Sequence, residues 1–338
     1  MPTINDVSKL AGVSKATVSR VINNKGKIKE STKTLVFEAM QTLNYQPNTL
    51  AQALASNTSH SIGLITSIFD GNYFGVLLKE SAKLADQAGK QLIVTDGHHD
   101  PQREIEAIDS LVARRCDVIL LYSRKLTQQD FKDIKARTST PIVVMNREVK
   151  NNIYRSVWFD HFHASSLAVN HLLELGHRAI ACITASVSSR TVKLRYGAFQ
   201  ACLAKQQIAI NQDLVVAGDY TIAGGYQACK KIIAQKQPFT AIYAFNDDMA
   251  IGAIRALHEI GIKVPEQVSV IGIDNEPFGS FVTPSLSSVE LPIKEITNAA
   301  MKIALDLANG VPVSPIDTEF RGKLIKREST TINHASLL

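Results

Sequence analysis

The chain has 338 residues, of which 45% are hydrophobic and 20% are charged, a composition typical of a soluble globular protein with about two or three domains. Its four cysteines form no C-x-x-C pair and its longest apolar runs are too short to cross a bilayer, which excludes a zinc ribbon, a disulfide framework and a membrane-spanning helix. The N-terminus shows no signal peptide, so we expect a cytoplasmic protein with buried free thiols.

Positive charge is concentrated at the N-terminus. The first 60 residues hold seven lysines and arginines against three acids, which gives them +4 of the total net charge of +6. Such a charge on a small segment indicates a polyanionic partner.

The same segment predicts three short helices. Thr3 and Asp6 have the spacing of a capping box, an apolar repeat at helical spacing follows, and Gly12 marks the end of that helix. Ser14 can cap a second helix over 15–23, and a third is expected over 31–43. Three such helices enclose a small core, which we expect to contain Ile4, Val7, Leu10, Val18, Val21, Leu35 and Leu43.

Two helices joined by a short glycine-containing turn form a helix-turn-helix. Short or hydrogen-bonding side chains line the outer side of the second helix, where they suit a DNA major groove: Lys15, Ala16, Thr17, Ser19 and Arg20. Lys and Arg can donate to guanine and Ala can pack on a thymine methyl, whereas Thr17, Ser19 and Asn23 suit phosphate oxygens. A generic three-helix bundle that binds protein is the alternative from this pattern alone.

The segment from Thr3 to Asn24 closely resembles the headpiece of the lactose/galactose repressor family, and the segments 44–48 and 51–55 match its next signatures. The resemblance continues to about Glu328 and is close to the galactose and β-glucoside repressor branch. It implies a DNA-binding transcriptional repressor with a hinge helix near 48–56 that orders on the operator. Leu54 would then wedge into the minor groove and kink the DNA. The implied DNA contacts are Thr3, Ser14, Lys15, Ala16, Thr17, Ser19, Arg20, Asn23, Asn48, Ala51 and Leu54.

From His60 onward, β-rich runs alternate with amphipathic helices, which predicts parallel sheets covered on both faces. We expect strands at 62–66, 91–95, 117–122, 141–145, 156–159, 179–184, 241–245 and 268–273, and a strand-like run at 214–217. The fold class is therefore α/β, with an all-α headpiece. The resemblance implies a two-lobed sensor like a periplasmic binding protein, with crossings near Asp160, Glu290 and Phe320. The expected divisions are a headpiece at 1–46, a hinge at 47–59, a sensor at 60–330 (one lobe about 60–160 and 290–320, the other about 161–289 and 321–330) and a tail at 331–338.

Ligands of such folds bind at the carboxyl ends of the strands. Aromatic and polar residues that suit a sugar fall at strand ends and early helix positions: Tyr73, Phe74, Asn146, Arg195, Tyr220, Asn246 and Asp274. By matched position, the resemblance assigns effector contacts to Arg195, Tyr220, Asn246 and Asp274, and more variable cleft positions to Tyr73, Phe74 and Asn146. Asn246 can instead cap the helix that follows it, or do both.

Other chemistries find less support. The pairs around His98 and His161 lack a complete set of metal ligands, and surface polarity or helix capping explains them. Asp247 and Asp248 are adjacent on a helix and point in different directions, which disfavours a catalytic pair. No phosphate-binding loop or catalytic triad is present, so we expect neither an enzyme nor a cofactor.

We expect a homodimer that binds a palindromic operator and responds to a galactoside or β-glucoside, as an inducer, with a phosphorylated sugar also open. The rival interpretation is a sugar-binding protein without DNA regulation.

Overall fold

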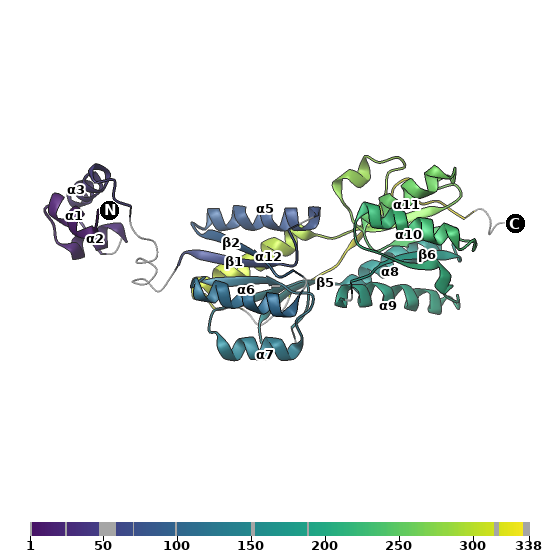
Figure 1. The fold of residues 1–338 in the computed structure, drawn as a ribbon, viewed down its shortest axis with the longest axis horizontal. Helices are drawn as coiled ribbons and strands as arrows, with labels where there is room; N and C mark the ends of the chain where they lie inside the picture. Colours follow the sequence, from purple (N-terminus) through teal and green to yellow (C-terminus); the bar gives the residue numbers. More distant parts are fainter. Residues whose placement is uncertain are drawn as a thin grey trace.

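The computed structural model describes residues 2–23, 26–46, 59–69, 71–98, 100–149, 153–187, 189–313 and 318–333. They form a helical headpiece and two six-stranded sheets, each covered by helices (Figure 1). Asn48, Ala51 and Leu54, together with the expected hinge helix, lie outside the described residues.

The headpiece contains the predicted helix-turn-helix. Its helices are α1 (Ile4–Leu10), α2 (Lys15–Ile22) and α3 (Glu30–Thr42). The backbone N–H of Thr3 donates to Asp6 Oδ2 at 2.8 Å, and Ser14 Oγ accepts from the N–H of Thr17 at 3.1 Å. These contacts satisfy amide groups at the starts of the two helices.

The headpiece core differs from the prediction at two leucines. Val7, Val18 and Val36 are fully buried, whereas Leu10 is 52% exposed and Leu35 is 50% exposed. Along α3, Val36, Ala39, Met40 and Leu43 form the inner stripe at spacings of three and four residues, which places Leu35 one residue off that stripe. Leu10 is displaced in the same way, because Val7 and Ala11 already occupy the inner side of α1.

The first sheet is entirely parallel, with the strand order β11-β5-β4-β3-β1-β2. Helices α5 (Asn72–Gln87) and α12 (Ile293–Ala308) cover one face, and α6 (Pro101–Ala113) and α7 (Gln128–Arg137) lie on the other (Figure 1). Its strands are β1 (Ser61–Thr66), β2 (Gln91–Asp96), β3 (Val118–Tyr122), β4 (Ile142–Met145), β5 (Arg155–Phe159) and β11 (Thr318–Phe320).

The second sheet has the order β12-β10-β9-β8-β6-β7 and is parallel except for the β10–β12 pair. Its strands are β6 (Ile180–Ala185), β7 (Val215–Gly218), β8 (Ala241–Ala244), β9 (Ser269–Asp274), β10 (Ser287–Glu290) and β12 (Lys323–Ile325). The helices on its two faces are α8 (His161–Glu174) with α9 (Arg190–Lys205), and α10 (Ile222–Ala234) with α11 (Asp247–Glu259), while η2 (Gln212–Leu214) and η3 (Pro277–Ser280) are short 3-10 turns (Figure 1).

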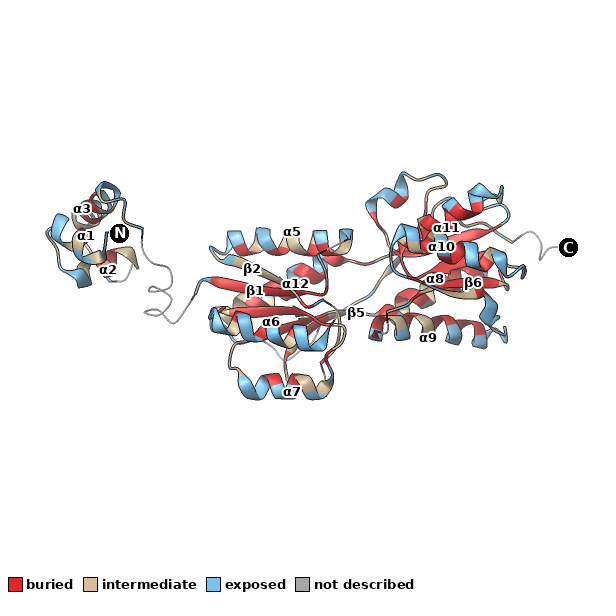
Figure 2. Ribbon diagram, in the orientation of Figure 1, coloured by how far each residue is buried: buried red, intermediate tan, exposed pale blue. Residues whose placement is uncertain are grey.

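Burial follows this layering. Strands with helices on both faces, such as β1 and β3, are buried along their whole length (Figure 2), as continuous apolar runs in parallel sheets require. All four cysteines are free and buried, which confirms the prediction of buried thiols. None of the described helices has the length and apolarity needed to span a membrane.

The chain passes between the two sheets three times, after β5, after β10 and after β11. These segments contact one another. The N–H of Asp160 donates to the carbonyl of Phe320 at 2.8 Å. Gly322 lies so close to its neighbours that a Cβ there would be 2.9 Å from the Glu290 carbonyl oxygen and 3.1 Å from the Phe159 ring. Only glycine therefore lets the three crossings pack side by side.

The difference between Val36 and Leu35 can be tested directly. We expect Val36→Ala to lower the free energy of headpiece opening by about 2 kcal/mol, because it leaves a cavity in a fully buried site. Leu35→Ala removes a half-exposed side chain and should change that free energy by less than about 0.5 kcal/mol. Hydrogen exchange of the headpiece amides in the full-length protein measures both. Equal effects of the two substitutions would contradict the orientation of α3 in which Val36 faces the core and Leu35 faces solvent.

Candidate effector cleft and DNA-reading helix

A cavity of about 470 Å³ lies where the carboxyl ends of the strands in the two sheets face each other. One wall comes from the start of α5 and the end of β3, and the other from α9, the β7–α10 turn, the start of α11 and the end of β9. The described residues that line it include six of the seven predicted effector contacts: Tyr73, Phe74, Arg195, Tyr220, Asn246 and Asp274.

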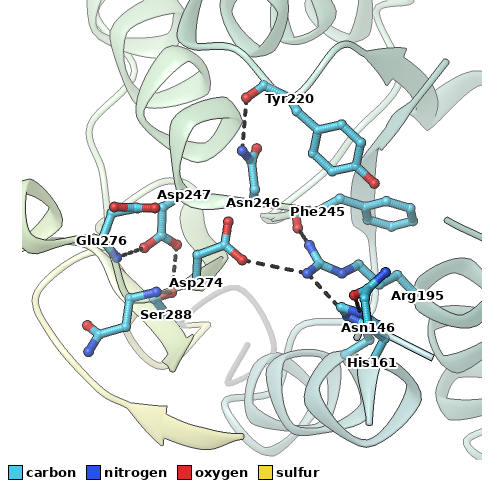
Figure 3. A network of polar contacts seen from close by, with 12 residues as sticks. Asn146, His161, Arg195, Tyr220, Phe245, Asn246, Asp247, Asp274, Glu276 and Ser288 are labelled. Atoms are coloured by element: carbon cyan, nitrogen blue, oxygen red, sulfur yellow. Dashed lines mark hydrogen bonds and ion pairs between the residues drawn. The ribbon is translucent and has the colours of Figure 1, made fainter. Parts of the chain in front are cut away.

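Arg195 is the centre of a buried polar network (Figure 3). Its side chain is only 3% exposed. One Nη atom lies 3.6 Å from Asp274 Oδ1 and 3.4 Å from His161 Nδ1, while the other donates to the carbonyl of Phe245. A guanidinium is always charged and must meet acceptors when it is buried. Asp274 supplies the negative charge, and the polar groups around it fix the direction of Arg195.

His161 connects this network to Asn146. Burial and the nearby arginines hold the pKa of His161 well below its ordinary value, so the imidazole is neutral. Because Arg195 can only donate, His161 Nδ1 accepts and Nε2 carries the hydrogen, which it donates to Asn146 Oδ1 at 3.1 Å. Asn146 does not line the main cavity; it lines a smaller pocket on the other side of His161. The structure thus separates Asn146 from the other six candidates.

The side chain of Asn246 forms hydrogen bonds with two backbone groups of the protein. Its Oδ1 accepts from the N–H of Met249 at 3.1 Å and so caps α11, and its Nδ2 donates to the carbonyl of Tyr220 at 2.9 Å. The backbone of Tyr220 has a positive φ of 69°, which non-glycine residues rarely adopt. Asn246 therefore holds the strained turn that presents the Tyr220 ring to the cavity, in addition to its cap.

Three carboxyl groups lie near one another on this side of the cleft (Figure 3): Asp274 and Glu276 line the cavity, and Asp247 is fully buried. Burial raises the pKa of Asp274 to about 6, although Arg195 opposes the shift. Burial and the nearby Asp274 raise the pKa of Asp247 to about 8 and that of Glu276 to about 7. Asp247 accepts from Ser288 Oγ at 2.6 Å and from the N–H of Glu276 at 2.8 Å. A Cβ on residue 272 would lie 2.2 Å from Asp247 Oδ1, so Gly272 makes room for this carboxyl group.

The opposite wall is aromatic. Tyr73, Phe74 and Tyr122 pack edge to face, with ring centroids 5.1 to 5.6 Å apart. Asn72 Nδ2, at the start of α5, donates to Glu276 Oε2 across the cleft. Stacking surfaces on one side and convergent hydrogen-bonding groups on the other are the combination that recognises a polyhydroxylated ring.

Sequence reasoning missed four residues of this site: Asn72, Arg124, His161 and Glu276. Helix capping accounts for Asp160 in the 160–163 segment, because its Oδ1 accepts from the N–H of His163 at the start of α8. An exposed polar position does not account for His161, which is 3% exposed. Arg124 follows the end of β3, so the rule that selected Asn146 at the end of a strand could have found it. No group of three potential metal ligands occurs among the described residues.

In the headpiece, Lys15, Ala16 and Arg20 are exposed on α2, and Thr17 and Ser19 are partly exposed beside them. Asn23 Nδ2 donates to the carbonyl of Ser19 at 2.8 Å, and Ser14 and Thr17 join in the cap of α2. Thr3 is exposed at the start of α1. The predicted DNA contacts among the described residues therefore lie on α2, at its two ends and at the start of α1, and their role in DNA binding stays a prediction.

Two family models match the chain. Residues 3–48 match bacterial regulatory proteins of the lacI family, and residues 169–330 match the periplasmic binding protein-like domain. The HTH-type transcriptional regulator AscG of Escherichia coli (strain K12) is 40% identical over 331 residues, which cover 97% of this chain and 98% of AscG. This protein belongs to the LacI family.

Solved structures agree with this assignment. A sugar-binding transcriptional regulator of the LacI family from Escherichia coli, complexed with phosphate, is 38% identical with a TM-score of 0.74, and the match covers 82% of this chain and 100% of that one. The lac repressor dimer bound to operator and the anti-inducer ONPF is 30% identical with a TM-score of 0.88, covering 98% of this chain and 99% of that one. The headpiece and the two-sheet sensor of this LacI-family protein therefore share one arrangement with a DNA-bound relative.

The raised pKa of Asp247 predicts how stability depends on pH. The folded protein holds a proton that the unfolded chain releases near pH 3.8, so this stabilisation is fully present below 3.8 and is lost as the pH rises through about 8. We expect the free energy of urea unfolding to fall, through this one group, by up to about 1.4 kcal/mol per pH unit between pH 5 and 7. Asp247→Asn should remove that part of the slope.

The exposed Asp133 on α7 provides the control, because Asp133→Asn removes the same charge without changing a buried group. It should keep the wild-type slope. If Asp247→Asn also kept the full slope, the buried carboxyl group would not be the source of the pH dependence.

Proposed function

We propose that this LacI-family protein is a transcriptional repressor whose operator affinity is controlled by a galactoside or β-glucoside bound in the cleft, with the sugar acting as inducer. The observation that carries the proposal is the cleft itself, where an aromatic wall faces the Arg195–Asp274 pair inside a cavity of about 470 Å³. A cavity of that size matches the range of small-molecule sites, about 300–1,000 Å³.

The chemistry of the cleft favours a sugar over other small molecules. Asp274 can accept from neighbouring hydroxyl groups while Arg195 donates to oxygens, and the rings of Tyr73 and Tyr220 offer faces to the C–H groups of a pyranose. The sugar-binding regulator with 38% identity supports this ligand class. The resemblance to the galactose and β-glucoside repressor branch favours these two glycoside types, and the apolar side chains Ile68, Ile222 and Leu291 that line the cavity suit an apolar aglycone.

The headpiece supports DNA binding. Lys15 and Arg20 are exposed on α2, which packs against α1 and α3 through the buried headpiece core. The operator-bound dimer of the related lac repressor supports a homodimer on a two-fold symmetric site. If sugar weakens operator binding, operator must weaken sugar binding by the same factor. We infer that the chain is not an enzyme, in keeping with relatives that are named as regulators.

DNA binding through α2 makes a first prediction. Lys15→Ala with Arg20→Ala should weaken selective binding to the DNA upstream of the protein's own and neighbouring genes by about 100-fold, because each good base contact is worth about 1–3 kcal/mol. Fluorescence anisotropy of labelled fragments measures this. Arg255→Ala with Lys263→Ala removes the same charge from exposed positions of the second sheet's layer and should leave binding unchanged. An equal loss of DNA affinity in both double variants would indicate that net charge accounts for the effect and that α2 does not read the bases.

Effector binding makes a second prediction. Galactose, methyl β-D-galactoside, methyl β-D-glucoside and phenyl β-D-glucoside are titrated into the protein–DNA complex, and at least one should release the DNA. Asp274→Asn should weaken that response about 100-fold, because it removes an acceptor and leaves Arg195 without its counter-charge. Asp213→Asn, an exposed change of the same kind, serves as the control.

Each other outcome has a distinct meaning. DNA binding that tightens with sugar would make the sugar a co-repressor. Sugar binding with no selective DNA binding would support the rival interpretation, a sugar-binding protein without DNA regulation.

A further inference from the structure

Arg124 is a cleft cation that the Arg195–Asp274 network does not include. It follows β3, and its guanidinium carbon lies 5.4 Å from the ring centroid of Tyr122, 5.8 Å from that of Phe74 and 5.9 Å from that of Tyr220. Tyr122 and Phe74 belong to the first sheet and its helix layer, whereas Tyr220 belongs to the second. Arg124 therefore spans the cleft through its contacts with aromatic rings.

The charge of Arg124 is only partly compensated. Within the described ranges it forms no ion pair, its Nη2 donates to the Tyr122 hydroxyl at 3.3 Å, and its Nε atom is buried without an acceptor. Contact with three aromatic faces stabilises a cation but satisfies no N–H group. A guanidinium in the wall of a cavity, with donors to spare, is suited to meet an oxygen of a bound molecule.

A buried carboxylate behind the cleft holds the turn that carries Arg124. Glu104 on α6 has no exposed surface, and its Oε2 accepts from Ser123 Oγ at 2.6 Å. Ser123 Oγ in turn accepts from the N–H of Leu126 at 3.3 Å, which closes the turn after β3. The backbone N–H of Arg124 also favours the charged form of Glu104.

The residues packed against Glu104 leave space for its side chain. A Cβ on residue 97 would lie 2.7 Å from Glu104 Cγ, so Gly97 leaves the space that the carboxylate side chain occupies. Burial raises the pKa of Glu104 to about 7, and the charged groups that act on it are Arg147 and Asp100. A buried carboxylate is unfavourable unless it is paired or hydrogen-bonded, and here its hydrogen-bond partner is Ser123, in the turn that carries Arg124.

We propose that Arg124 is a specificity-determining residue that donates to an oxygen of the bound sugar, and that Glu104 is a positioning residue that holds Arg124 in place through Ser123. The inference rests on the proposed function, because it needs an effector in the cleft. It adds a ligand contact from the first sheet's layer and a residue that acts on the ligand without touching it.

The test measures affinity for the four sugars named above by calorimetry on the full-length protein. Arg124→Met should weaken the tightest-binding sugar by about 10- to 100-fold, the effect of removing one charged hydrogen-bond donor. Arg255→Met, on the exposed side of α11, should leave affinity unchanged. Wild-type affinity in Arg124→Met would overturn the role of Arg124.

A double-mutant cycle tests Glu104. Glu104→Ala should weaken binding about tenfold, and Glu104→Gln, which keeps an acceptor for Ser123, should restore it to within about threefold. In the Arg124→Met background, Glu104→Ala should have less than about a twofold effect, because no guanidinium remains to be positioned. Equal weakening in both backgrounds would make Glu104 merely structural and overturn the proposal. If Glu104→Ala fails to fold, Ser123→Ala takes its place in the cycle.

A second measurement separates this inference from the proposed function. If the wild-type protein binds none of the four sugars, the proposed effector class fails, and with it the contact between Arg124 and sugar. Amide exchange of residues 123–126 in the ligand-free protein then decides the role of Glu104. Faster exchange in Glu104→Ala than in Glu104→Gln supports positioning, and equal exchange contradicts it.

Discussion

The cleft depends on the balance of charge around Arg195. This guanidinium is buried where the α9, β8 and β9 segments meet, and a buried cation is tolerated only when its acceptors are in place. Asp274 from β9 and the carbonyl of Phe245 after β8 provide them, while neutral His161 at the start of α8 adds a third contact. Four segments that are distant in sequence are thereby held in one arrangement, and the polar face of the cavity follows from it. Removal of Asp274 would leave the guanidinium charge uncompensated where a ligand would bind, whereas loss of either neutral acceptor would leave an N–H group without a partner.

The two walls of the cleft differ in how they are built. The wall from the second sheet is organised by ionisable groups that fix one another, as Asp247 does for the backbone of Glu276. The other wall is organised by aromatic packing, with Arg124 among the rings. A ligand between the walls would meet a mainly polar surface on one side and a mainly aromatic surface on the other. In this arrangement, hydrogen bonds from one wall would orient the hydroxyl groups of a ligand, and packing against the other wall would depend on the shape of its ring.

Much of the fold could be predicted because apolar runs in parallel sheets are bounded by polar residues. All eight strands expected between 62 and 273 are present, and their ends differ by one residue at most. The strands β10, β11 and β12 escaped prediction because they have only three or four residues with few large apolar side chains, so neighbouring strands define them. The prediction placed Leu35 in the core because several apolar residues on α3 could form its inner face. Which of them face inward depends on the helices that α3 packs against, and these favour Val36.

The site was predictable to the extent that its residues follow strands. Tyr220, Asn246 and Asp274 do so, and the structure places them in the same cavity. Asn72 and Glu276 meet across the cleft, and no local pattern marks such a contact. Arg124 follows β3, so the strand-end rule applied to it as well, although the prediction did not include it. Glu104 is the most hidden of these residues, since a glutamate on an amphipathic helix is ordinarily assigned to solvent.

The packing of the three crossings around Gly322 has a mechanical consequence. Parallel segments in mutual contact resist sliding past one another, but they can bend together about a line perpendicular to their length. We therefore expect the two sheet layers to move relative to each other by bending at these crossings, and a side chain added at Gly322 to restrict that movement.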